Sequence, residues 1–227
     1  MGLKSTFTYK SLAAAKRGFQ VIRTLFHEQG FLKSVLAARP VGPHGEAIPW
    51  FTYPAIEYLK QFDFSDKIVF EYGSGNSSIF WAQRAREVIA VESDRPWFEH
   101  VSKMRPPNLL LILEDGKEAY VSSISRQDRK FDVIVIDGRW RNACTATCPD
   151  FLADHGMIIF DNSDRQYEGC NKLRAKGFFQ VDFNGFSPIN GYASTTSIFI
   201  RASTELQSNF SPSNPVGGLK QLACDDD

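Results

Sequence analysis

Five acidic residues follow one another along the middle of this 227-residue chain, each beside the end of a short apolar run. They are Glu71, Glu92, Asp115, Asp137 and Asp161. Short apolar runs that alternate with helical segments predict the strands of a parallel sheet. The carboxyl ends of such strands meet at one edge, where α/β proteins bind their ligands. We therefore expect these acids to face one site, where they could bind hydroxyl or amino groups or accept a proton.

A glycine-rich turn follows the first of these runs. The segment Glu71-Tyr72-Gly73-Ser74-Gly75 ends a predicted strand at 67–72, and a helix is expected from residue 77. Glycines let the backbone turn tightly and approach a ligand closely. Glu92 comes about 20 residues later, after the second predicted strand, where a carboxylate can hold both hydroxyls of a ribose. Ser78 stands where a dinucleotide fingerprint needs its third glycine, which argues against a nicotinamide dehydrogenase.

These motifs require an α/β domain with a doubly wound, mostly parallel, seven-stranded sheet. Strands are expected at 67–72, 88–91, 109–113, 133–136, 157–160, 178–183 and 195–200, and helices at 77–86, 96–104, 117–124, 143–152 and 167–176. No helix separates the last two strands, so they should form an antiparallel hairpin. We expect the loop between them, with Asn190 and Tyr192, to overhang the site, as should Trp50, Phe51 and Tyr53 of the N-terminal cap. The alternative is that these three aromatics are packing residues, which is favoured for Phe51.

Composition divides the chain into three parts. Residues 1–45 are a predicted helical cap and linker, with apolar residues three and four apart from Leu12 to Phe26 and a helix-breaking segment from Pro40 to Gly45. Seven Lys and Arg residues and a single acid, Glu28, precede residue 40. We expect the apolar stripe to pack onto the domain, with a weak membrane-surface contact as the alternative. Residues 46–202 form the ligand-binding domain, and residues 203–227 a flexible polar tail.

The overall composition is that of a globular, cytoplasmic protein. The 26 basic and 26 acidic residues give a formal net charge of zero, and 43% of the residues are hydrophobic. No apolar run approaches the roughly 20 residues of a membrane-spanning helix. No basic, aromatic-interleaved stripe in the core indicates a nucleic-acid partner. The four cysteines lack zinc-site spacing, which favours reduced thiols, and nothing indicates the oligomeric state.

The glycine-rich turn and the acids around it resemble motif I of the class I S-adenosylmethionine-dependent methyltransferases, over roughly residues 68–201. The resemblance implies S-adenosylmethionine as the cofactor. Glu71 would lie near its methionine amino group, Glu92 would bind its ribose diol, and Asp115 would meet its adenine amino group. Trp97 is either a flank of the adenine ring or a core aromatic. The implied cofactor-binding residues are Glu71, Gly73, Ser74, Gly75, Glu92, Asp115 and Gly116.

The ends of the fourth and fifth predicted strands resemble metal-dependent O-methyltransferases of the catechol and caffeoyl-CoA type. The resemblance implies that Asp137, Asp161 and Asn162 hold a divalent cation such as Mg²⁺. Such an ion would lower the pKa of an acceptor hydroxyl. Without a metal, Asp137 or Asp161 could itself be the general base.

The match to that family is incomplete, because Trp140 stands where it has a lysine. Arg139 and Arg141 flank Trp140 and could clamp an anionic acceptor, and Arg139 joins Asp137 and Asp161 as a catalytic candidate. The expected function is methylation of a small-molecule acceptor, on oxygen. The alternatives are methylation of a macromolecule and a non-catalytic nucleotide-binding module docked through its basic N-terminal helix.

Overall fold

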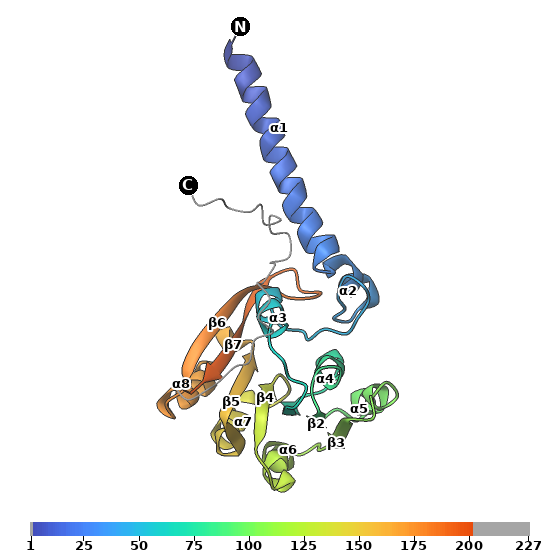
Figure 1. Cartoon of the computed structure of the whole chain (residues 1–227), viewed down its shortest axis with the longest axis vertical. Coiled ribbons are helices and arrows are strands. Elements are labelled where there is room, and N and C mark those ends of the chain that lie inside the picture. The colour runs from blue at the N-terminus through green and yellow to red at the C-terminus, as the bar shows by residue number, and fades with distance from the viewer. Residues whose placement is uncertain (1, 202–227) are drawn as a thin grey trace.

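A seven-stranded sheet organises the part of the chain that the computed structural model describes, which is residues 2–201 with side chains from residue 10 onward (Figure 1). Its strands lie in the order β3-β2-β1-β4-β5-β7-β6. The first five are parallel, and β7 runs antiparallel between β5 and β6. The strands are β1 (Ile68–Tyr72), β2 (Glu87–Glu92), β3 (Leu109–Leu113), β4 (Phe131–Ile136), β5 (Leu152–Asp161), β6 (Phe179–Phe186) and β7 (Ala193–Ile200). This confirms the predicted fold and its closing hairpin, whereas the tail predicted at 203–227 lies outside the described residues.

Helices cover both faces of the sheet, as the alternation of side chains along each strand requires. On β1, for example, Val69 packs in one apolar cluster and Phe70 in the other. The first cluster includes side chains of α3 (Tyr53–Leu59), α4 (Asn76–Ala82) and α5 (Arg95–Ser102). The second includes side chains of α6 (Lys117–Ser122), α7 (Arg141–Thr147) and α8 (Tyr167–Ala175). Short 3₁₀ turns lie at η2 (Ser123–Gln127), η3 (Cys148–Phe151) and η4 (Ser163–Arg165).

The boundary between α7 and β5 differs from the expected one. The helix predicted at 143–152 ends at Thr147, and β5 begins at Leu152, so His155 and Gly156 lie inside a strand. Pro149 accounts for the early end, because it has no N–H to continue the helical hydrogen bonds and restricts the residue before it.

The N-terminal helices also differ from the packed cap that the sequence predicts. α1 (Gly2–Arg23) projects from the domain, continues as a π-helical turn, η1 (Thr24–Glu28), and is followed by α2 (Phe31–Ala37) (Figure 1). On α1, Leu12 is 66%, Phe19 68% and Ile22 55% exposed, so the packed-cap prediction is wrong for this helix. Contact with the core begins only at Leu25 and Phe31. Within the described residues, no helix combines the length and apolarity needed to cross a membrane.

Candidate active site

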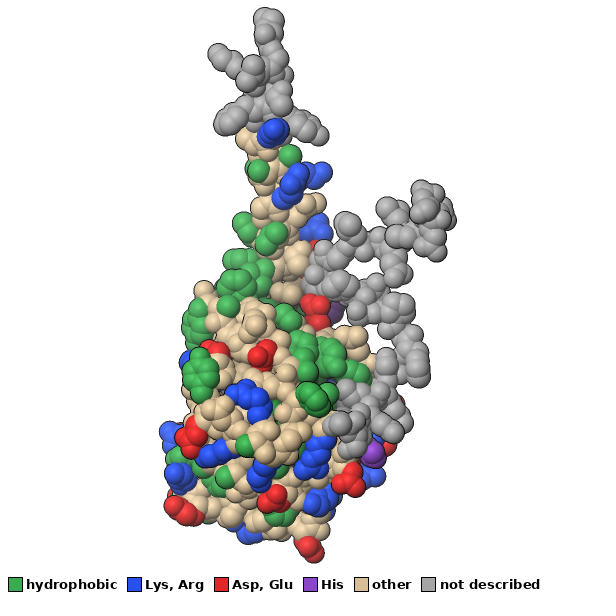
Figure 2. All heavy atoms as spheres, turned by 90° about the vertical axis from the view of Figure 1, so that its left-hand side faces the viewer, with side chains coloured by type: hydrophobic (Ala, Val, Ile, Leu, Met, Phe, Trp, Pro, Cys, Tyr) green, Lys and Arg blue, Asp and Glu red, His purple; other side chains and the backbone are tan. Residues whose placement is uncertain are grey.

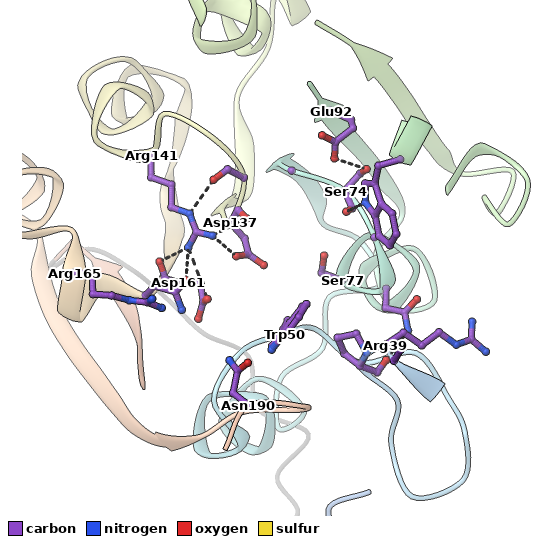
Figure 3. A pocket seen from close by; sticks show the side chains of 18 of the residues that line it. Arg39, Trp50, Ser74, Ser77, Glu92, Asp137, Arg141, Asp161, Arg165 and Asn190 are labelled. Carbon is purple, nitrogen blue, oxygen red and sulfur yellow. Dashed lines mark hydrogen bonds and ion pairs between the residues drawn. The ribbon is translucent and has the colours of Figure 1, made fainter. Parts of the chain in front are cut away.

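A cavity of about 550 Å³ lies at the carboxyl ends of β1, β2, β4 and β5 (Figure 3). This edge contains the switch point of the sheet, because β1 lies between β2 and β4 in the strand order. Its size suits a small-molecule ligand, for which pockets of roughly 300–1,000 Å³ are usual. Of the predicted site residues, those that line it are Gly73, Ser74, Gly75, Glu92, Asp137, Asp161 and Asn162.

Two glycines let the turns after β1 and β4 touch beneath this cavity. Gly73 has φ +106°, a conformation that side chains rarely tolerate. A Cβ on Gly138 would lie 2.8 Å from the Gly73 nitrogen and 2.1 Å from the Tyr120 hydroxyl oxygen. The two turns approach so closely only because neither residue has a side chain. The backbone of the predicted glycine turn is therefore exposed to whatever occupies the cavity.

Glu92 lies directly beside that turn. Its Oε2 accepts a hydrogen bond of 2.9 Å from the Ser74 hydroxyl, which ties the end of β2 to the end of β1. Its Oε1 accepts from the backbone N–H groups of Ser93 at 2.6 Å and Asp94 at 2.9 Å. The carboxylate is thus held in one orientation at the cavity wall. A carboxylate oxygen has two lone pairs, so Oε2 keeps one for a ligand hydroxyl.

Trp97 is a wall of the cavity and not a core aromatic. Its Nε1 donates a 2.8 Å hydrogen bond to the Ser74 carbonyl oxygen, and its ring lies beside Gly75. The ring stacks on His100 with 5.1 Å between centroids and is otherwise partly open to solvent. Trp97 therefore offers an aromatic surface next to the glycine turn.

Glu71 lies beneath the turn and does not line the cavity. It is fully buried, and its Oε2 accepts a hydrogen bond from the Ser78 hydroxyl, which in turn accepts from the Gly75 N–H at 3.2 Å. Burial raises the pKa of Glu71 to about 8. A neutral carboxyl group in this position supports the turn, whereas the contact with a ligand amino group that the resemblance implies would need the ionised form.

This pKa predicts a pH dependence of stability. Glu71 ionises near pH 4.5 when unperturbed and near 8 in the folded protein, so folding favours the protonated form. The stability that this proton provides is complete below about pH 4.5 and is lost as the pH rises through about 8. We expect the free energy of unfolding of Glu71→Gln, measured by urea denaturation, to fall less steeply over this window than that of the wild type. Parallel curves for the two proteins would contradict the assignment.

Besides Glu71, three further predicted site residues do not reach the cavity. Asp115 and Gly116 follow β3, and Asp115 is exposed at that edge of the sheet. Arg139, the predicted catalytic arginine, is also exposed. None of the three lines the cavity, so the arrangement of the described residues gives no support to their predicted roles.

Arg141 takes the central position between the ends of β4 and β5 instead. Its Nε donates to the Gly138 carbonyl oxygen at 2.9 Å, and its Nη1 donates to the Asp161 carbonyl oxygen at 2.6 Å and to Asn162 Oδ1 at 3.1 Å. Its Nη2 donates to the Asp137 carbonyl oxygen and lies 3.0 Å from Asp137 Oδ1. These contacts use the five N–H donors of a guanidinium. Arg141 therefore fastens two strand ends together and has no donor left to clamp an acceptor.

The two aspartates that meet Arg141 have perturbed acidities. Burial raises the pKa of Asp137, although the adjacent guanidinium opposes this shift. Burial raises the pKa of Asp161 as well, and the negative charge of Asp137 raises it further. Asp161 Oδ1 also accepts a 2.6 Å hydrogen bond from the Thr196 hydroxyl. Asp161 is therefore the more readily protonated of the two and holds the proton of the pair, which leaves Asp137 ionised and available to accept one.

The residues predicted to hold a metal ion do not fit one as they are arranged. Two of the three predicted ligand side chains, Asp137 and Asn162, already contact the Arg141 guanidinium, and Asp161 Oδ2 lies 3.7 Å from it. A cation in the same place would meet a fixed positive charge. Within residues 10–201, no group of three or more His, Cys, Asp or Glu side chains is arranged to hold a metal.

The rim of the cavity comes from two segments far apart in sequence. The loop between β6 and β7 contributes Asn190 and Tyr192, and the chain after α2 contributes Pro40 and Trp50 (Figure 3). Phe51 and Tyr53, which were also expected to overhang the site, are instead buried in the apolar core. Sequence reasoning had not assigned Arg165, Asn76 or Ser77 to the site. Arg141 comes four residues after Asp137, but α7 begins only at Arg141, so no helical spacing rule could have predicted the contact between the two side chains.

Comparisons with known proteins give information on the fold alone. No protein-family model matches the chain, and no curated protein matches it. A precorrin-6y C5,15-methyltransferase from Geobacter metallireducens superposes with a TM-score of 0.53 at 13% identity, over 66% of this chain and 87% of that one. An rRNA methylase from Streptococcus thermophilus gives 0.50 at 14% identity, over 65% and 96%. A spermidine synthase in complex with the transition state analogue AdoDATO gives 0.50 at 15%, over 67% and 60%.

These proteins share the fold of this chain but differ in what their names say they act on. The likeness therefore identifies the architecture and leaves the reaction open. On this evidence the chain has the class I methyltransferase fold.

Proposed function

We propose that this chain is an S-adenosylmethionine-dependent methyltransferase that acts on a small molecule, on oxygen. One observation carries the proposal: the Gly73–Gly75 turn and Glu92 lie on one wall of a cavity whose other wall holds Asp137 and Asp161. A donor site and a proton acceptor thus share one enclosed space. The distant likeness to methyltransferases of known structure is in keeping with this reading of the site.

The cofactor wall fits an adenosyl ligand by its chemistry. Glu92 would accept a hydrogen bond from the ribose diol through the free lone pair of Oε2. The backbone at Ser74 and Gly75 would contact the portion between ribose and methionine, and Trp97 would cover an aromatic base. When bound, S-adenosylmethionine supplies a methyl group on a positively charged sulfur. The residues of the chain then need only orient the two reactants and exclude water.

Asp137 is the proposed general base. Its carboxylate lines the cavity and has a raised pKa, which makes it a better proton acceptor than an exposed aspartate. Arg141 holds it in place through Oδ1 and through the Asp137 carbonyl oxygen. An acceptor hydroxyl beside it would pass its proton to this carboxylate as the new bond to carbon forms. The rim residues Trp50, Asn190 and Tyr192 would restrict this position to acceptors small enough to enter.

The test is transfer of an isotopically labelled methyl group from S-adenosylmethionine to a fractionated metabolite extract. A labelled small molecule that forms with the wild type and fails to form with Asp137→Asn supports the proposal. Labelling of RNA or protein in place of metabolites would show a macromolecular acceptor. Binding of the cofactor without any transfer would favour a non-catalytic nucleotide-binding module.

We expect the same transfer to be insensitive to metal chelation. Arg141 already supplies the positive charge between Asp137 and Asp161, so a divalent cation has no free ligand set there. The assay with EDTA should run at the rate of the untreated enzyme, and added Mg²⁺ or Mn²⁺ should not accelerate it. Loss of transfer with EDTA and its recovery with Mg²⁺ would restore the metal site implied by the sequence.

A further inference from the structure

α1 presents an apolar stripe that no other described residue covers. Leu12, Phe19 and Ile22 are separated by seven and three residues, so they lie on one face of the helix. All three are more than half exposed. Figure 2 shows hydrophobic side chains along one edge of the projecting helix, down to the point where it joins the domain. An apolar surface of this kind on a helix that leaves its domain marks an interaction site.

The same helix carries a surplus of positive charge. The sequence has no acidic residue before Glu28, and Glu28 forms an ion pair of 2.7 Å with Arg23. Lys10, Lys16 and Arg17 form no ion pair within the described residues, and Figure 2 shows basic side chains beside the apolar edge. The partner of α1 must therefore accept both an apolar face and several cations.

Two of the three obvious partners satisfy only half of this requirement. A second copy of the chain could cover the apolar stripe, but it would bring two sets of unpaired cations together. A nucleic acid would attract the cations, but its phosphate backbone leaves Phe19 and Ile22 exposed to water. An anionic lipid surface meets both conditions, because the apolar side chains enter the boundary between headgroups and acyl chains while Lys and Arg stay among the headgroups.

We propose that α1 docks this protein on the surface of an anionic lipid bilayer, with Leu12, Phe19 and Ile22 facing the lipid. The docked segment leads directly to the active-site cavity, because Ala38, Arg39 and Pro40 follow α2 and line it. Leu36 on α2 is itself largely exposed. Docking therefore connects the membrane surface to the cavity through η1 and α2, which lie between the anchored helix and Ala38. The proposal concerns location and does not depend on the reaction that the cavity performs.

Sedimentation of the full chain with lipid vesicles tests the proposal. The protein should sediment with vesicles of phosphatidylcholine and phosphatidylserine, bind pure phosphatidylcholine far more weakly, and dissociate as salt is added. The double variant Lys16→Glu/Arg17→Glu should lower the partition coefficient on anionic vesicles at least about tenfold, because each basic residue near such a surface contributes about fivefold. Phe19→Ser should lower it on the same vesicles without changing the net charge.

Lys103→Glu/Arg105→Glu is the matched control, because it changes the net charge equally at exposed positions on the domain. It should sediment like the wild type. Equal losses for the two double variants would show attraction by net charge alone and would overturn the proposal. So would equal binding to neutral vesicles, concentration-dependent self-association without vesicle binding, or binding to RNA in preference to vesicles. Circular dichroism and thermal unfolding confirm that each variant is folded.

Discussion

Glu92→Ala is expected to weaken the binding of S-adenosylmethionine by roughly ten- to a hundredfold. The carboxylate is fixed by three hydrogen bonds and keeps a lone pair toward the cavity. A hydrogen bond to a charged group contributes about 1.5–3 kcal/mol, so losing the one that this lone pair would accept from the ribose weakens binding by a factor on the order of ten to one hundred. Isothermal titration calorimetry with the cofactor and its demethylated product measures the change.

Two further variants separate the ligand contact from damage to the fold. Glu99→Ala removes the same charge from an exposed position on α5 and should bind the cofactor like the wild type. Glu92→Gln keeps the shape of the side chain and should still lose most of the affinity, because the charge is gone. Unchanged affinity in Glu92→Gln, with an unchanged melting temperature, would remove Glu92 from the cofactor site.

Arg141→Met is expected to be the most destabilising substitution at the site. The side chains of Arg141 and Asp137 are each 17% exposed and that of Asp161 is 4% exposed, so the aspartates depend on the guanidinium. Removing one partner from a buried ion pair costs about 3–5 kcal/mol in the free energy of unfolding. The loss should be larger at alkaline than at mildly acidic pH, because protonation relieves the repulsion between the two carboxylates. Urea denaturation at both pH values provides the measurement.

The control for this variant is Arg126→Met. Arg126 pairs with Glu114 but is 44% exposed, so its loss should cost less than about 1 kcal/mol. Combining Arg141→Met with Asp161→Asn should recover part of the stability, since one of the two unpaired acids is then neutral. Equal effects of Arg141→Met and Arg126→Met would show that Arg141 does not fasten the strand ends.

The sheet could be predicted because burial leaves a strong pattern in the sequence. Strands covered on both faces read as short apolar runs, and those at residues 68–72 and 109–113 were located almost to the residue. The length of β5 was missed because His155 and Gly156 are typical of a turn. In the structure they lie at an irregularity of the β4–β5 pairing, between the Phe131–Leu152 and Val133–Met157 pairs, which no sequence pattern indicates. The direction of α1 could not be predicted either. An apolar stripe indicates that a helix face is covered, but it does not indicate which surface covers that face.

The parts of the site that backbone geometry determines could be predicted from the sequence. The parts that depend on the direction of long side chains could not. Gly73, Gly75 and Glu92 follow from the need for a tight turn and a carboxylate at the next strand end. The choice between Arg139 and Arg141 depends on the direction in which the chain leaves β4, since one arginine points to solvent and the other crosses to β5. The position of Asp115 likewise depends on a loop whose path no periodicity encodes.

The cation between Asp137 and Asp161 belongs to the polypeptide itself. The occupancy of an exchangeable metal site depends on the concentration of the ion in solution, and the ion dissociates when that concentration falls. A guanidinium is placed once, when the chain folds, and remains covalently attached. This edge of the sheet therefore carries the same charge in magnesium-poor and magnesium-rich surroundings, and it cannot be switched by withdrawing an ion.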